Sequence, residues 1–187
     1  MRPAGPDAVR EAVLEAAARL FAERGVERVS LRSIAEAADV KLPLIGRYIG
    51  RRSELIDAVF ERLSGQVVGY VEANPLEPLE YGRDSMLGRW MTMVAHYTLH
   101  EEVPQLGAMN PVRSLAGVFE TSFDIDARTA RLRAAQVTAI SLGWRLFEDY
   151  LIASTELDDF SLDELRRDLN AIQQLIGSAL LPTPGRG

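Results

Sequence analysis

The sequence predicts an all-α protein, because its apolar residues recur at helical spacing and no segment alternates polar and apolar residues like a strand. Capping residues and breaks containing proline or glycine divide the chain into segments of helix length. The 187 residues are 47% hydrophobic and 26% charged, which is typical of a globular chain that buries a sizeable core. We therefore expect a small N-terminal helical domain followed by a helical bundle.

The first helix is expected to run from Asp7, as its N-cap, to about Arg24, where Gly25 supplies a left-handed stop. The residues before it, with Pro3 and Pro6, are expected to form a loose arm. One face of this helix is apolar along its length and is formed by Val9, Val13, Ala16, Ala17, Leu20 and Phe21.

Residues 30–48 predict two short helices joined by a tight turn. Ser30 is placed to N-cap the first helix. Asp39 lies where the chain turns sharply, and Asp adopts left-handed backbone angles at modest cost. Pro43 fits only the first turn of a helix, so the second helix is expected over residues 42–48. Two short helices about such a turn form a helix-turn-helix, whose second helix enters the major groove of DNA.

Five more helices are predicted from spacing and caps. The first opens at Ser53 and Glu54, reaches about Val71 and is ended by the break at residues 74–78. The next covers residues 82–102 and is ended by Pro104. The remaining three are expected over residues 112–123, over residues 127–154 after Asp126 as N-cap, and from Ser161, which forms a capping box with Glu164.

Composition excludes several classes of protein. Zero cysteines exclude disulfides, thiolate catalysis and thiolate metal sites. The chain has no apolar run of membrane-spanning length and no apolar signal core near its start, so we expect a cytoplasmic protein without a membrane segment.

The net charge of −6 is unevenly distributed along the chain. Residues 1–56 hold ten basic and eight acidic residues, and the remainder hold eleven basic and nineteen acidic residues. This balance favours a DNA-facing head on an acidic body.

Several short motifs occur in order between Val13 and Phe60, in the segment LEAAARLFAERGVERVSLRSIAEAADVKLPLIGRYIGRRSELIDAVF. The first expected helix contains an alanine pair and the dipeptide LF, and the turn after it reads ERG. The second helix contains IA, and the turn that follows reads A-x-V. The third helix has a tyrosine near its end, followed by a glycine with two basic residues and by the EL that opens the connecting helix. With this order and spacing, the segment resembles the N-terminal domain of TetR-family transcriptional repressors. The resemblance implies a helix-turn-helix DNA-binding domain at residues 1–54, with a connecting helix to about residue 72. It also implies a ligand-binding and dimerisation domain at residues 73–187, which is similar to the family by helix order alone.

The segment departs from the family pattern at four positions. Asp39 replaces the usual turn glycine, and Arg52 replaces the usual lysine. Leu44 stands where many members have a small hydroxyl residue, and Gly46 stands where an aromatic usually contacts the DNA backbone. Gly46 also costs about 1 kcal/mol of helix stability relative to Ala. We therefore expect DNA binding with base contacts unlike those of better-known members.

The resemblance assigns DNA contacts by position. Leu44 would give apolar contact, for instance with a thymine methyl, whereas Arg47 would bind guanine O6 and N7. The other residues would contact phosphates or bases, and Lys41, Arg51 and Arg52 are alternatively ordinary solvated charges. The full predicted set is Ser30, Arg32, Lys41, Leu44, Arg47, Tyr48, Arg51 and Arg52.

His96 and His100 are the only histidines, at a spacing that can place two imidazoles on one metal. No third ligand can be assigned from spacing, so no metal site and no cofactor are predicted. Hydration, or hydrogen bonds to neighbouring helices, is the simplest interpretation, and polar contact with a ligand is the next.

The body is rich in aromatic and methionine residues, which suit an adaptable apolar pocket. Each is individually explained as core, but the resemblance favours a pocket for a small-molecule effector. The predicted lining is Met86, Trp90, Met93, His96, Tyr97, Phe119, Phe123, Trp144 and Phe147.

The last two helices present more apolar surface than one bundle needs, so we expect them to pair with a second copy in a C2 homodimer. The alternative is packing wholly within the chain. The predicted interface is Val137, Ile140, Leu151, Leu165, Leu169, Ile172 and Ile176.

Together these features predict a ligand-responsive transcriptional regulator, usually a repressor, that binds a near-palindromic DNA operator as a homodimer. A dimeric small-molecule-binding protein that has lost sequence-specific DNA binding is the alternative. An enzyme is not expected, because no nucleophile–base pair or Glu-x-x-His pair is present.

Overall fold

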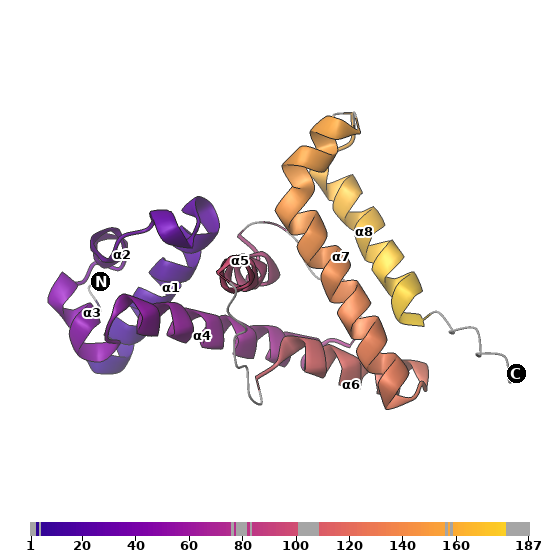
Figure 1. The fold of residues 1–187 in the computed structure, drawn as a ribbon. Coiled ribbons are helices and arrows are strands. Elements are labelled where there is room, and N and C mark those ends of the chain that lie inside the picture. Colours follow the sequence, from indigo (N-terminus) through magenta and orange to yellow (C-terminus); the bar gives the residue numbers. More distant parts are fainter. Residues whose placement is uncertain are drawn as a thin grey trace, which may run out of the picture. The chain divides into compact units, whose positions relative to one another are not determined.

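The computed structural model describes residues 3, 5–75, 77, 82, 84–100, 109–155, 157 and 159–178. All regular secondary structure among these residues is helical, which confirms the predicted fold class (Figure 1). By internal contacts the chain divides into two compact units, residues 1–67 with 82–109 and residues 68–81 with 110–187. None of the helices in the described ranges has the length and hydropathy needed to cross a bilayer.

The first unit contains the predicted N-terminal helices. They are α1 (Pro6–Arg24), the short 3-10 helix η1 (Val26–Arg28), α2 (Leu31–Ala37), α3 (Leu42–Tyr48), most of α4 (Arg52–Ala73) and α5 (Met86–Leu99). The predicted apolar face of α1 is buried throughout. Helices α2 and α3 both pack on α1, so α1 forms the base of the helix-turn-helix.

Both ends of α1 differ in detail from the prediction. Asp7 is not the N-cap, because Pro6 begins the helix and Gly5 occupies the cap position without a side-chain hydrogen bond. Proline suits this first position, since its fixed φ is helical and its missing N–H is no loss. Gly25 does end the helix at a positive φ of 81°, but its ψ of 147° is not left-handed helical. A non-glycine residue would be strained there.

The helix-turn-helix forms as predicted. Ser30 caps α2, and Asp39 in the turn has a φ of 51°. Pro43 lies in the first turn of α3. Capping, turn and helix start therefore all follow from the local sequence.

Helix α5 is shorter than expected at its start. It begins at Met86 rather than Gly82, because the Ser85 hydroxyl accepts a hydrogen bond from the Gly88 N–H and accordingly caps the helix. The expected end at Glu102 and the Pro104 stop lie outside the described residues. Within the first unit α5 packs on α1.

The second unit contains α6 (Pro111–Phe123), α7 (Ala127–Ser154) and α8 (Leu162–Ser178), with the last turns of α4. The predicted caps are present, since Asp126 accepts from two N–H groups of α7 and Ser161 pairs with Glu164. Helices α7 and α8 lie antiparallel, joined at the α7 C-terminus (Figure 1). The core of this unit is formed by Ala116, Phe119, Ala130, Ala134 and Val137.

The division by contacts places α5 with the N-terminal helices. The functional division at residue 54, with a connecting helix to about residue 72, stays a prediction.

Candidate nucleic-acid interface

Helix α3 has one buried anchor and an exposed basic face. Ile45 is fully buried against the bundle. Lys41, at the N-cap position, and Arg47, in the last turn, are exposed. Leu44 and Tyr48, on the same helix, are half-buried. The helix therefore offers two cations and two partly apolar side chains to an external partner.

Leu42 is a surface residue that sequence reasoning missed. It is 43% exposed in the first turn of α3, next to exposed Pro43. It lies three residues before Ile45, so periodicity alone would assign it to the buried face. Only the packing of this short helix shows that it faces outward.

Ser30 is engaged in a reciprocal capping box. Its hydroxyl accepts from the Ser33 N–H at 3.1 Å, and the Ser33 hydroxyl lies 3.1 Å from the Ser30 N–H. This arrangement fixes the start of α2, where Arg32 is exposed. Ser30 therefore has a structural role in addition to any contact with phosphate.

The two arginines at the start of α4 differ in environment. Arg51 is exposed. The half-buried Arg52 donates hydrogen bonds to the carbonyl oxygens of Val29 at 2.5 Å and Val26 at 2.6 Å. Arg52 thus joins α4 to the segment that leads into α2, a contact that no local sequence pattern indicates.

Two contacts of Tyr48 stabilise the C-terminal end of α3. The Arg10 guanidinium donates to the Tyr48 carbonyl oxygen at 3.4 Å, which ties α1 to α3. The Arg47 guanidinium carbon lies 5.4 Å from the centre of the Tyr48 ring, within cation–π range. Arg47 is therefore held beside an aromatic ring while remaining exposed.

An ion-pair network on the first unit joins three helices. Glu15 of α1 lies 3.0 Å from Arg62 of α4 and 2.7 Å from Arg89 of α5, and Glu11 also pairs with Arg62. Burial alone would raise the pKa of the Glu15 carboxyl, but hydrogen bonds and charge from Arg89 and Arg62 hold that pKa below its ordinary value. Glu15 therefore stays ionised and links α1 to both helices.

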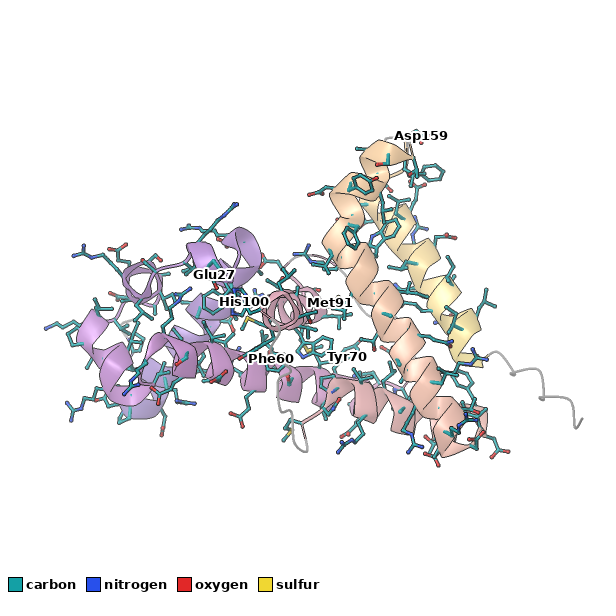
Figure 2. The ribbon with its side chains drawn as sticks, viewed as in Figure 1. Glu27, Phe60, Tyr70, Met91, His100 and Asp159 are labelled. Carbon is teal, nitrogen blue, oxygen red and sulfur yellow. The ribbon has the colours of Figure 1, made fainter. Side chains whose placement is uncertain are left out.

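The two histidines meet a third side chain from a distant part of the chain. His96 Nδ1 on α5 and Nε2 of His100, the C-cap of that helix, lie 3.5 Å and 3.7 Å from the same Glu27 oxygen on η1. Figure 2 shows Glu27 beside His100. The predicted hydrogen bonding of the histidines to a neighbouring element is consistent with this cluster.

The predicted effector-site residues have varied environments. Trp90, Met93 and Tyr97 are buried in the first unit, and Phe119 is buried in the second. Phe147 is instead 56% exposed. The remaining members, Met86, His96, Phe123 and Trp144, are half-buried. Their role in ligand binding stays a prediction.

The predicted interface residues also divide by exposure. Val137 and Leu169 are buried within the single chain, because α6, α7 and α8 pack together around them. Ile172 is 43% exposed, and Ile140, Leu151, Leu165 and Ile176 are half-buried. The apolar residues most exposed on these two helices are Leu146, Phe147, Tyr150 and Leu175, of which the prediction named only Phe147, and for a different site.

A family model and curated relatives both match this chain, and all of them describe bacterial transcriptional regulators. Residues 13–59 match the family model described as bacterial regulatory proteins, tetR family. The HTH-type transcriptional repressor Rv3405c of Mycobacterium tuberculosis is 33% identical over 171 residues, covering 90% of this chain and 88% of the relative. The HTH-type transcriptional regulator Mb3439c of Mycobacterium bovis matches with the same identity and coverage.

Solved structures with a similar fold include two bacterial regulators. A TetR-family transcriptional regulator from Streptomyces coelicolor has a TM-score of 0.51 at 16% identity, covering 90% of this chain and 96% of that chain. The fatty acid degradation regulator FadR from Bacillus halodurans has a TM-score of 0.51 at 16% identity, covering 92% and 95%. At this identity the likeness concerns the fold.

Proposed function

The chain belongs to the TetR family of bacterial regulatory proteins, and we propose that it binds a near-palindromic operator as a homodimer and is released by a small effector. It is a helix-turn-helix transcriptional regulator and not an enzyme. The finer proposal concerns how the DNA is bound, how two copies assemble and what ends the binding.

The observation that carries the DNA-binding proposal is the exposed face of α3. Its buried Ile45 fixes the helix on the bundle, while Arg47 and Lys41 remain available. An exposed arginine on a recognition helix suits bidentate contact with guanine, and lysine suits a phosphate. Exposed Leu42 and half-buried Leu44 add apolar surface that suits a thymine methyl.

Exposed apolar side chains on the second unit support the homodimer. Phe147 and Tyr150 of α7 are 56% and 69% exposed, and Ile172 of α8 is 43% exposed. Apolar groups in such number on two neighbouring helices favour burial against another surface. A second copy of the same helix pair gives a self-complementary C2 interface, as near-palindromic DNA requires.

Effector control and repression rest on family membership. TetR-family regulators typically bind small-molecule effectors, and the relative from Mycobacterium tuberculosis is named a repressor. We propose an apolar or amphipathic effector, because the predicted lining residues are mostly aromatic or methionine. Such an effector acts by binding more tightly to a conformation that does not fit the operator. We further propose that the protein acts in the cytoplasm.

The test is fluorescence anisotropy with labelled duplexes from the region upstream of the protein's own gene. Sequence-selective binding should weaken steeply with salt, and Arg47→Ala should lower the specific affinity by about 1–3 kcal/mol. Arg113→Ala, at an exposed position of α6, serves as the matched control and should leave the affinity unchanged.

Two results would contradict the proposal. Affinity that is indifferent to Arg47 would remove the assignment of α3 as the reading helix. Absence of any sequence-selective binding, with a stable dimer, would favour the alternative of a small-molecule-binding protein that no longer recognises DNA.

A further inference from the structure

We propose that Glu27, His96 and His100 form a binding site for a divalent transition-metal ion of the zinc class. The three ligand atoms, one from each side chain, lie within 4.8 Å of one another. The two histidines are four residues apart at the C-terminal end of α5, and Glu27 comes from η1, between α1 and α2.

The separations match those of ligands around a small cation. Ligands held at about 2.0–2.1 Å from zinc in a tetrahedron lie roughly 3.3–3.4 Å from one another. The Glu27 oxygen lies 3.5 Å from His96 Nδ1 and 3.7 Å from His100 Nε2. Small side-chain rotations therefore bring all three atoms to bonding distance of one ion.

The hydrogen bonding of His100 provides an independent indication. Its Nδ1 lies 2.7 Å from the backbone carbonyl oxygen of His96, and because a carbonyl only accepts, Nδ1 carries the proton. In the neutral ring Nε2 then has the lone pair, and this lone pair faces the Glu27 oxygen. An imidazole nitrogen and a carboxylate oxygen so placed can both bind one metal cation. Histidines that bind metals usually have this second hydrogen bond, which sets their tautomer.

The chemistry of the donors selects the metal class. Two imidazoles and one carboxylate favour Zn²⁺ and its neighbours over Mg²⁺ or Ca²⁺, which prefer oxygen ligands. His100 is 47% and Glu27 65% exposed at the side chain, so the site is open to solvent and to a further ligand. His96 is 13% exposed and forms the inner wall of the site.

The location of the site gives metal binding a structural consequence. Glu27 lies three residues before Ser30, which caps α2, and His100 is the C-cap of α5. A bound ion would therefore join the end of α5 to the segment leading into the helix-turn-helix, all within the first unit.

The experiment is a titration of tag-free, chelator-treated full-length protein with Zn²⁺ and with Co²⁺ at about pH 7.5. Binding is followed by calorimetry, by the visible absorption of Co²⁺ and by the rise in Tm, with Mg²⁺ as the hard-cation control. We expect one ion per chain. His96→Gln, His100→Gln and Glu27→Gln should each lower the Zn²⁺ affinity at least about tenfold.

Two controls keep the result specific. The exposed carboxylate of Glu36 on α2 is replaced in Glu36→Gln, which should bind Zn²⁺ like the wild type. The variant His96→Gln/His100→Gln removes every imidazole of the chain, so any remaining binding comes from other groups. Equal Zn²⁺ affinity of the wild type and either this double variant or Glu27→Gln would overturn the proposal. The Zn²⁺ affinity is measured without DNA, so failure of the metal-site proposal would leave the DNA-binding proposal unaffected.

Discussion

The guanidinium of Arg52 lies 2.5 Å from the carbonyl oxygen of Val29, immediately before the residue that caps α2. A second hydrogen bond to Val26 at 2.6 Å makes the contact bidentate. Arg52 is twenty-three residues from Val29 in sequence, so the contact defines how α4 supports the helix-turn-helix. The planar guanidinium offers separate N–H donors in a fixed fork, one for each carbonyl group, whereas a lysine ammonium is a single compact donor centre.

Arg52→Lys should therefore destabilise the protein although it keeps the charge. We expect a loss of about 1–2 kcal/mol in the free energy of unfolding, because hydrogen bonds from a charged donor are lost. Arg51→Lys, at the exposed neighbouring position, should change stability little. Urea denaturation of both variants measures the difference, and equal stability would show that the bidentate contact contributes nothing.

Gly46→Ala should stabilise α3. The added methyl group would meet open space, and Ala gains about 1 kcal/mol over Gly inside a helix. Gly50→Ala is the opposing control, because Gly50 has a φ of 115° and its methyl group would collide with Glu54. Thermal denaturation should show a higher Tm for the first variant and a lower one for the second. A lower Tm for Gly46→Ala would mean that α3 is not a regular helix at this position.

Glu15 should contribute stability that depends on pH. Its pKa is lower in the folded protein than its ordinary value of 4.5, so the contribution is fully present above that pH. It is lost as the pH falls through the folded-state pKa. Glu15→Gln should therefore cost about 1 kcal/mol at pH 7, since the pairs are partly exposed, and less in acid.

Glu23→Gln provides the matched control for this pH dependence. Glu23 pairs with Arg19 one turn away on the same helix and does not link α1 to α4 or α5 in any contact of the described residues. We expect a change within about 0.5 kcal/mol. Urea denaturation from pH 3 to 7 compares the variants. If the loss of unfolding free energy caused by Glu15→Gln were larger in acid than at pH 7, the lowered pKa of Glu15 would be contradicted.

Ser64→Ala should leave a buried donor without its partner. The Trp90 indole N–H donates to the Ser64 hydroxyl at 3.1 Å, and Ser64 is fully buried. We expect a cost of about 1–3 kcal/mol. The same substitution should cost less in a Trp90→Phe background, where no indole N–H remains, and equal costs in the two backgrounds would exclude the interaction. Ser122→Ala, at an exposed position of α6, is the neutral control.

Ile172→Glu should weaken the proposed homodimer. A charge in an apolar interface is left without water, which favours dissociation. Gln174→Glu introduces the same charge about 200° around the helix and should leave the dimer intact. Sedimentation velocity across a concentration series measures both, and an unchanged dimer for Ile172→Glu would place the interface elsewhere.

Much of this protein is determined by local sequence. Ser30, Asp39 and Pro43 specify the cap, the turn and the helix start by backbone preferences that act over a few residues. Asp126 and Ser161 do the same for the last two helices. Because these signals follow one another in a definite order along the chain, they are enough to predict the fold class and the position of α3.

Tertiary packing decided what periodicity cannot resolve. Leu42 lies at helical spacing from the buried Ile45 and is nevertheless exposed. Val137 is buried within the single chain, although it was expected in the interface between two copies. Glu27 reaches the two histidines across about seventy residues of sequence, a distance that no local preference spans. Spacing along a helix fixes which residues share a face, but only the packing of one helix on another decides which face is covered and which distant side chains meet.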